Sequence, residues 1–146
     1  MWLFDVNILI YAFRPASPFH KPCDQWLREV LHRGDAFFLA ELVELAFLRL
    51  NTLPLPNRVV PTFAECWNFL TFLRKAPGCH RARIGERHGT IFQGLCHDLK
   101  LSGNDLNDAW LTALALEHKI TLVSADEGFD RFTGLRWLNP LKTDQH

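Results

Sequence analysis

The residues of this sequence best suited to form a catalytic site are acidic. The candidates are Asp5, Glu41, Glu44, Asp105, Asp108 and Asp126. Clustered carboxylates repel one another unless a cation lies between them, and Mg²⁺ and Mn²⁺ are hard cations that prefer oxygen ligands. Such an ion lowers the pKa of a bound water molecule and neutralises the charge that grows on a phosphate. Three or four of these acids would be enough for a hydrolytic metal site.

Two of the acids come where apolar segments end. Asp5 follows the first apolar segment, and Asp126 ends the segment ITLVSAD. Ligands of open α/β sheets bind beyond the carboxyl ends of the strands. An aspartate at the end of a strand is also a common turn or helix-capping residue. Two of them at equivalent ends of parallel strands favour the functional interpretation.

The other acids fall on expected helices and leave alternatives open. Asp105 and Asp108 begin an alanine-rich helix, where acids complement the helix dipole, so capping explains one of them without catalysis. Glu41 and Glu44 lie three residues apart on one helical face, and one of them could be a surface charge. The histidines show no HExxH or other paired spacing, which disfavours a zinc hydrolase.

Apolar periodicity predicts the elements that must position these acids. Strands are expected from Trp2 to Asp5 or Val6, and at Ala36–Ala40, Ile120–Ser124 and Leu135–Leu138. Helices are expected at Lys21–Arg33, Glu41–Leu50, from the N-cap Thr62 to Leu73, at Arg83–Leu99 and at Asp105–His118. The alternation predicts a three-layer α/β/α sandwich with a central parallel sheet of four or five strands.

Length and composition fit one soluble domain spanning residues 1–146. No apolar segment is long enough to span a bilayer, and no basic residue precedes the first apolar segment, so neither a membrane span nor a secretory signal is expected. The four cysteines form no CxxC pair, which favours reduced thiols in a cytoplasmic protein.

The net charge is zero, but the charges are unevenly distributed. Between Arg74 and Lys100 there are six Lys and Arg residues against Glu86 and Asp98. A basic surface beside an acidic cluster suits an enzyme that handles a phosphodiester, because cations position backbone phosphates. Taken alone, such a segment is more commonly an ordinary solvated helical face.

Three segments together resemble a known family. FDVNILIYAFR, SGNDLNDAWLTALALEH and ITLVSADEGFDRFTGLRWLNP are similar to PIN-domain ribonucleases, and in particular to the VapC toxins of bacterial toxin–antitoxin pairs. The resemblance covers nearly the whole chain, with the segments in the family's order. ELVELAFLRL followed by Thr52 and Pro54 also looks like a segment of this branch.

The resemblance implies a role for each matching residue. Asp5 matches the first acid of the family site, and Asn7 matches a polar residue that helps to hold it. Asp108 in NDAW matches the third acid, and Asp126 in SAD matches the fourth. Ser124 matches a Ser or Thr two residues before that aspartate. By the same match Asp105 is a capping neighbour and not a ligand.

The second acid departs from the commonest pattern. Many PIN domains carry a glutamate at or near the position of Ala46, whereas in this branch the acid matches Glu41, with Glu44 as the reserve. A further departure is Gly128, where related toxins often have another aspartate. Glu127 or Asp130 could supply an additional acid there.

The resemblance implies a metal-dependent endoribonuclease, the toxin component of a type II toxin–antitoxin system. Asp5, Glu41, Asp108 and Asp126 would hold Mg²⁺ or Mn²⁺, and metal-activated water would cut RNA. It also implies a cognate antitoxin, whose C-terminal segment covers the site, and a homodimer. Candidate RNA contacts are Arg14, Arg49, Arg81, Arg83 and Arg87.

Two rival hypotheses remain. A catalytically degenerate PIN domain would bind RNA or a protein without cutting, and it would show no Mn²⁺-dependent stabilisation. A phosphotransfer enzyme or receiver domain also places aspartates at strand ends. A phosphatase of the haloacid-dehalogenase type needs a second aspartate two residues after Asp5, where Asn7 stands.

Overall fold

A parallel sheet forms the centre of the molecule. The structure, a computed structural model, describes residues 1–145 and the side chains through Lys142. The strands are β1 (Trp2–Phe4), β2 (Phe37–Ala40), β3 (Cys79–Ala82), β4 (Thr121–Val123) and β5 (Trp137–Leu138). All neighbours pair in parallel, in the order β3-β2-β1-β4-β5. β1 pairs with β2 on one side and with β4 on the other, so the order of the strands changes direction next to β1. Parallel sheets bind ligands at such a switch point, beyond the carboxyl ends of the strands.

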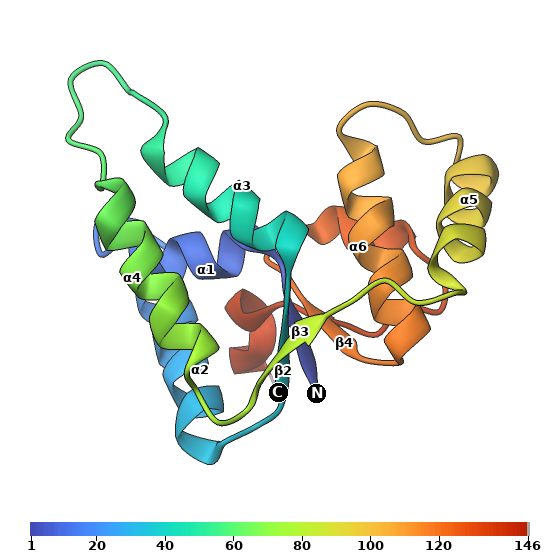
Figure 1. Ribbon diagram of the computed structural model, residues 1–146, viewed down its shortest axis with the longest axis horizontal. Helices are drawn as coiled ribbons and strands as arrows, with labels where there is room; N and C mark the ends of the chain where they lie inside the picture. Colours follow the sequence, from blue (N-terminus) through green and yellow to red (C-terminus); the bar gives the residue numbers. More distant parts are fainter. Residues whose placement is uncertain (146) are drawn as a thin grey trace.

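Helices cover both faces of this sheet (Figure 1). They are α1 (Val6–Phe13), α2 (His20–Arg33), α3 (Glu41–Thr52), α4 (Phe63–Arg74), α5 (His88–Leu99) and α6 (Asp105–His118). In Figure 1, α1 to α4 lie on one side of the sheet, and α5 and α6 pack together on the other. Two 3₁₀ turns, η1 (Glu127–Arg131) and η2 (Pro140–Gln145), follow β4 and β5. The predicted three-layer sandwich is confirmed, and its sheet has five strands.

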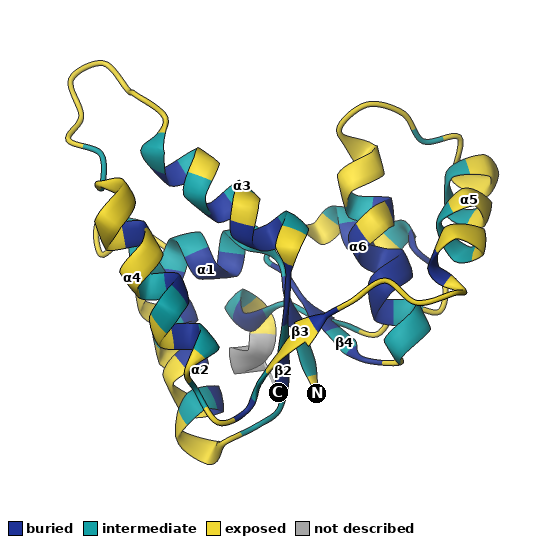
Figure 2. Cartoon of the chain, in the orientation of Figure 1, coloured by how far each residue is buried: buried dark blue, intermediate teal, exposed yellow. Residues whose placement is uncertain are grey.

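The central strands form because their residues are apolar on both faces. Leu3, Phe4, Leu122 and Val123 have no exposed surface, as expected for strands covered by helices on both sides. Figure 2 shows buried residues on the helix faces turned towards the sheet and exposed residues on the outer faces. The capping box predicted at Thr62 is present at the start of α4.

One strand was not predicted, and two predicted elements have other bounds in the structure. β3 was not predicted, because two of its four residues, His80 and Arg81, are polar and exposed at the edge of the sheet. α1 begins directly after Asp5, so the first strand is shorter than expected. α5 begins at His88 rather than Arg83.

The start of α5 is set by a contact with α6. The carboxylate of Glu117 accepts hydrogen bonds from the backbone N–H groups of Gly85 (2.7 Å) and Arg87 (2.9 Å). These bonds attach the segment that precedes α5 to the last turn of α6. A Cβ atom at Gly85 would lie 2.6 Å from Glu117 Oε2, so a larger residue there would displace this carboxylate.

The cysteines and the helix lengths bear on two further expectations. All four cysteines are free, and Cys23 and Cys66 are buried. Within residues 1–145, no helix is long and apolar enough to cross a membrane.

Candidate active site

Asp5 lies at the junction of β1 and α1. Its backbone N–H donates to Val123 O (2.9 Å), which continues the pairing of β1 with β4 by one residue. As the N-cap of α1 it accepts a hydrogen bond from Val6 N at Oδ1 (2.8 Å). Its Oδ2 accepts a hydrogen bond from the Ser124 hydroxyl (2.7 Å). Both carboxylate oxygens are therefore oriented by the sheet edge and the first helical turn.

Ser124 and Asn7 connect Asp5 to the segment after β4. Ser124 is fully buried, and its Oγ accepts hydrogen bonds from Asn7 Nδ2 (3.2 Å) and from the backbone N–H of Asp126 (3.0 Å). Asn7 Oδ1 accepts a hydrogen bond from Ala125 N (3.2 Å). These contacts fix the positions of Asp5 and Asp126 relative to one another.

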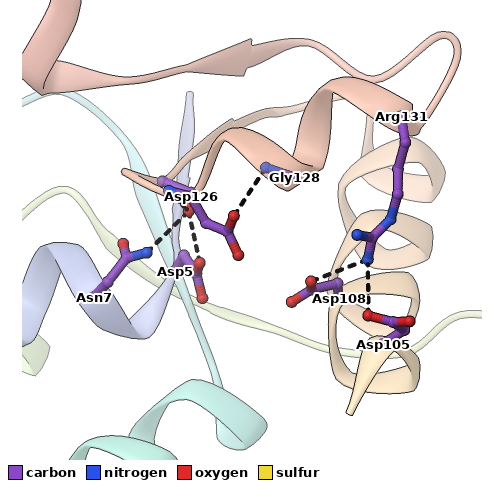
Figure 3. Close-up of polar contacts among 8 residues, drawn as sticks. Asp5, Asn7, Asp105, Asp108, Asp126, Gly128 and Arg131 are labelled. Atoms are coloured by element: carbon purple, nitrogen blue, oxygen red, sulfur yellow. Dashed lines mark hydrogen bonds and ion pairs between the residues drawn. The ribbon is translucent and has the colours of Figure 1, made fainter. Parts of the chain in front are cut away.

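Asp126 and Asp108 approach Asp5 from two other elements (Figure 3). Asp126 is the N-cap of η1 and accepts a hydrogen bond from Gly128 N (2.8 Å), whereas Asp108 extends from the first turn of α6. Burial, opposed by the hydrogen bonds from Ser124 and Val6 and reinforced by the charges of Asp108 and Asp126, raises the pKa of Asp5 to about 6. Burial and the charge of Asp126 also raise the pKa of Asp108. The structure thus brings three of the predicted acids together.

One cation, Arg131, was missed by the sequence reasoning. Its Nη2 lies 3.1 Å from Asp108 Oδ2 and 3.5 Å from Asp105 Oδ1 (Figure 3). Asp105, expected to cap α6, instead faces this guanidinium, and the N-cap position belongs to Asn104. No periodicity marks Arg131, because it stands in a short 3₁₀ turn, and its place beside α6 depends on the fold.

The two candidates for the second acid lie in different surroundings. Glu44 is 7 % exposed, and its Oε1 lies 2.7 Å from Nε of Arg74, so this acid joins α3 to α4. Glu41 is exposed and directly follows β2 at the same sheet edge as Asp5. It lines a cavity of about 490 Å³ together with Arg83 and Trp110. Glu44 is therefore engaged in a structural ion pair, whereas Glu41 is exposed and lines a cavity whose other lining residues include none of the three clustered acids.

The acids considered near Gly128 lie at the surface. Glu127 is exposed and forms an ion pair with Lys142, and Asp130 is also exposed. A Cβ atom at Gly128 would lie 3.0 Å from Asp126 Oδ1 and 3.2 Å from Arg131 Nη1. Glycine therefore leaves the space that these two side chains use.

The predicted RNA-contact arginines divide into two groups. Arg14 is partly buried and donates from Nε to Asn51 Oδ1 (2.7 Å) and from Nη2 to Leu50 O (3.2 Å), which ties the end of α1 to α3. The other four are exposed: Arg49, Arg81, Arg83 and Arg87. The last three lie on or after β3, towards the carboxyl edge of the sheet.

The donor set has the chemistry of a hard-cation site. Asp5, Asp108 and Asp126 offer only carboxylate oxygens, and their mutual repulsion would be relieved by a divalent cation such as Mg²⁺ or Mn²⁺. In the described part of the chain, no three His, Cys, Asp or Glu side chains are grouped closely enough to hold an ion. Asp108 Oδ2 is instead paired with Arg131. The carboxylate donors fit the chemistry of such an ion.

Comparisons with known proteins identify the family. The PIN domain model matches residues 2–135. VapC ribonuclease Mb2897 of Mycobacterium bovis is 38 % identical, over all of this chain and 99 % of the relative. Ribonuclease VapC43 of Mycobacterium tuberculosis shows the same identity and coverage. The crystal structure of VapBC2 from Rickettsia felis bound to a promoter DNA fragment contains a chain with a TM-score of 0.72 and 15 % identity, covering 94 % of this chain and 97 % of that one. The chain therefore belongs to the PIN-domain family and, within it, to the VapC group.

Proposed function

We propose that this protein is a metal-dependent endoribonuclease, built as one PIN domain, and the toxin component of a type II toxin–antitoxin pair. The observation that carries the proposal is the convergence of Asp5, Asp108 and Asp126 at the carboxyl edge of the sheet. The raised pKa of Asp5, about 6, reflects burial beside like charges, an arrangement typical of functional sites. The full-length similarity to VapC ribonucleases supports RNA as the substrate.

In this proposal Asp5, Glu41, Asp108 and Asp126 hold Mg²⁺ or Mn²⁺. When bound, the ion would supply a water of lowered pKa and offset the charge that grows on the phosphate. The protein's own contribution is orientation: Ser124 donates to Asp5 Oδ2 and accepts from Asp126 N, so two ligands share one buried hydroxyl. Each oxygen of Asp5 accepts one hydrogen bond and keeps a second lone pair, with which it can coordinate a cation, and the attacking nucleophile in this proposal is water.

The basic residues near β3 fit the path of the RNA backbone. Arg81, Arg83 and Arg87 are exposed, and Arg83 lines the same cavity as Glu41. We assign them to backbone phosphates, where cations fix position without reading sequence. Arg14 is bound within the fold and contributes less to RNA contact than the other candidates.

We further propose a cognate antitoxin, a homodimer and a cytoplasmic location. The Rickettsia felis structure is described as VapBC2 on promoter DNA, which supports an antitoxin partner for this chain. Large apolar side chains are exposed around the carboxyl edge of the sheet: Leu45 (65 %), Ile84 (53 %) and Trp110 (36 %). Exposed apolar groups of this kind favour contact with a second chain.

The proposal is tested by cleavage of a structured RNA. Purified protein with Mn²⁺ should cut the RNA, EDTA should stop the reaction, and excess Mn²⁺ should restore it. Asp126→Asn should remove activity, whereas Asp24→Asn, which changes an acid on α2 paired with Arg28, should not. Cleavage that is insensitive to EDTA would contradict the proposal. Absence of both cleavage and Mn²⁺-dependent stabilisation would favour the degenerate binding module.

A further inference from the structure

Arg131 carries a permanent positive charge and lies against two of the acids. Its guanidinium contacts Asp108, one of the proposed ligands, and Asp105, which lies one helical turn earlier on α6 (Figure 3). Asp108 is the more buried of the two, with a side chain 26 % exposed against 54 % for Asp105. The cation therefore bridges an inner and an outer carboxylate.

The guanidinium is held by contacts other than these ion pairs. Its Cζ lies 4.8 Å from the centroid of the Phe132 ring, and Nη1 occupies the space beside Gly128. Its Nε is buried and, among the described residues, has no hydrogen-bond partner. A buried N–H group without an acceptor raises the free energy of the folded state, so Arg131 leaves one of its hydrogen bonds unmade in this position. Its attraction to the carboxylates offsets that cost.

A divalent cation and Arg131 would compete for the same oxygen. Asp108 Oδ2 lies 3.1 Å from Nη2, and an ion coordinated by this oxygen would bring a double positive charge against the guanidinium. We propose that Arg131 is an exchangeable counter-ion, which neutralises Asp108 in the metal-free protein and moves to Asp105 when Mg²⁺ or Mn²⁺ takes Asp108. This inference rests on the proposed metal dependence, and it assigns Arg131 and Asp105 a positioning role in that site.

The competing explanation is that Arg131 is a structural link between η1 and α6. The two explanations predict opposite changes in metal affinity. A structural link holds Asp108 in place, so its loss weakens metal binding. A counter-ion competes with the metal, so its loss strengthens metal binding while it destabilises the metal-free protein.

The experiment measures Mn²⁺ binding by calorimetry and thermal unfolding with and without Mn²⁺, on EDTA-treated protein at low ionic strength. Arg131→Gln should tighten the Mn²⁺ dissociation constant by on the order of tenfold, lower the metal-free melting temperature and enlarge the melting shift on adding Mn²⁺. Arg131→Lys, which retains the charge, should bind Mn²⁺ nearly as the wild type does. The matched control is Arg136→Gln, which removes an exposed arginine bonded to the Lys119 carbonyl and should change none of these values.

Asp105→Asn provides a second variant if Arg131→Gln fails to fold. With its outer partner removed, Arg131 should remain on Asp108 and weaken Mn²⁺ binding by several fold. Unchanged Mn²⁺ binding in Asp105→Asn alone would contradict the exchange. Where Arg131→Gln does fold, Asp105→Asn in that background should have much less effect, because no guanidinium is left to redirect.

Each outcome decides between defined alternatives. Unchanged or weakened Mn²⁺ binding in Arg131→Gln, or equal effects of Asp105→Asn in both backgrounds, would overturn the counter-ion role while the proposed function stands. A wild-type protein that binds no Mn²⁺ would overturn both.

Discussion

Two acids on adjoining parts of the fold, Glu44 and Asp5, meet very different surroundings. Glu44 on α3 lies 2.7 Å from the guanidinium of Arg74, which itself stacks over Trp67. Asp5 accepts hydrogen bonds from a hydroxyl and a backbone amide but faces two further carboxylates. The first charge is matched within the fold, whereas the second is surrounded by charges of its own sign.

This difference distinguishes an acid that stabilises the fold from one that serves a site. A paired buried acid contributes through its partner, and removing either member leaves an uncompensated charge. When an acid buried beside like charges ionises, it destabilises the folded protein, and the raised pKa of Asp5 reflects this destabilisation. Such an acid is typical of a functional site, where a bound cation would offset the repulsion between the carboxylates.

The largest expected effect is on catalysis at Asp5. Asp5→Asn should lower RNA cleavage by on the order of a thousandfold while leaving the fold intact. Since the amide carries no charge, we also expect the metal-free protein to become more stable, by about 1 kcal/mol. Cleavage assays and urea unfolding measure the two effects. Cleavage at the wild-type rate in this variant would show that Asp5 is not a residue of the active site, and Asp5 and Glu44 would then not differ in function.

Glu44 should show the opposite pattern. Glu44→Ala should destabilise the protein by roughly 3 kcal/mol, because it leaves the Arg74 guanidinium unpaired between α3 and α4. Urea unfolding measures the loss, with Arg28→Ala as a surface control expected to change stability by less than about 0.5 kcal/mol. The folded fraction of Glu44→Ala should still cut RNA. A variant that is stable but inactive would make Glu44 the second ligand.

The pH dependence of stability reports on Asp5 directly. Its pKa is about 6 in the folded protein against an ordinary value of 3.8, so between these values the unfolded chain releases a proton that the folded chain keeps. Stability of the metal-free protein should therefore fall as pH rises through this window, by on the order of 2 kcal/mol, and stay lower above it. Thermal unfolding from about pH 4 to about pH 7 measures this decrease. Asp5→Asn should reduce the decrease to the part contributed by Asp108, whose pKa is also raised, and an equal decrease in both proteins would assign it to groups other than Asp5.

The smallest effect distinguishes the two glutamates. Glu41→Gln should weaken Mn²⁺ binding by about tenfold, because it removes one charged oxygen ligand at the end of β2. Glu44→Gln should leave the Mn²⁺ affinity of the folded protein unchanged. Calorimetric titration of both variants gives the comparison. A reversed result would show that Glu44 leaves Arg74 to bind the metal.

Local pattern was sufficient for much of the fold. The bounds of α6, Asp105–His118, agree with the prediction because an Ala- and Leu-rich segment with acids in its first turn defines a helix by itself. The capping box at Thr62 is also a local signal. β3 carried no such signal, because its pairing with β2 depends on backbone hydrogen bonds more than on apolar side chains.

Local patterns in the amino-acid sequence are enough to predict the parallel α/β class, the position of Asp5 at the end of a strand, and the order of the acids along the chain. Which charges meet depends on how the elements pack. Glu44 finds Arg74 30 residues away, and Asp108 finds Arg131 23 residues away. Periodicity records which face of an element is buried, but it does not record which polar group lies opposite. The partner of each acid, and with it the distinction between a structural and a functional carboxylate, is therefore a property of packing between distant segments.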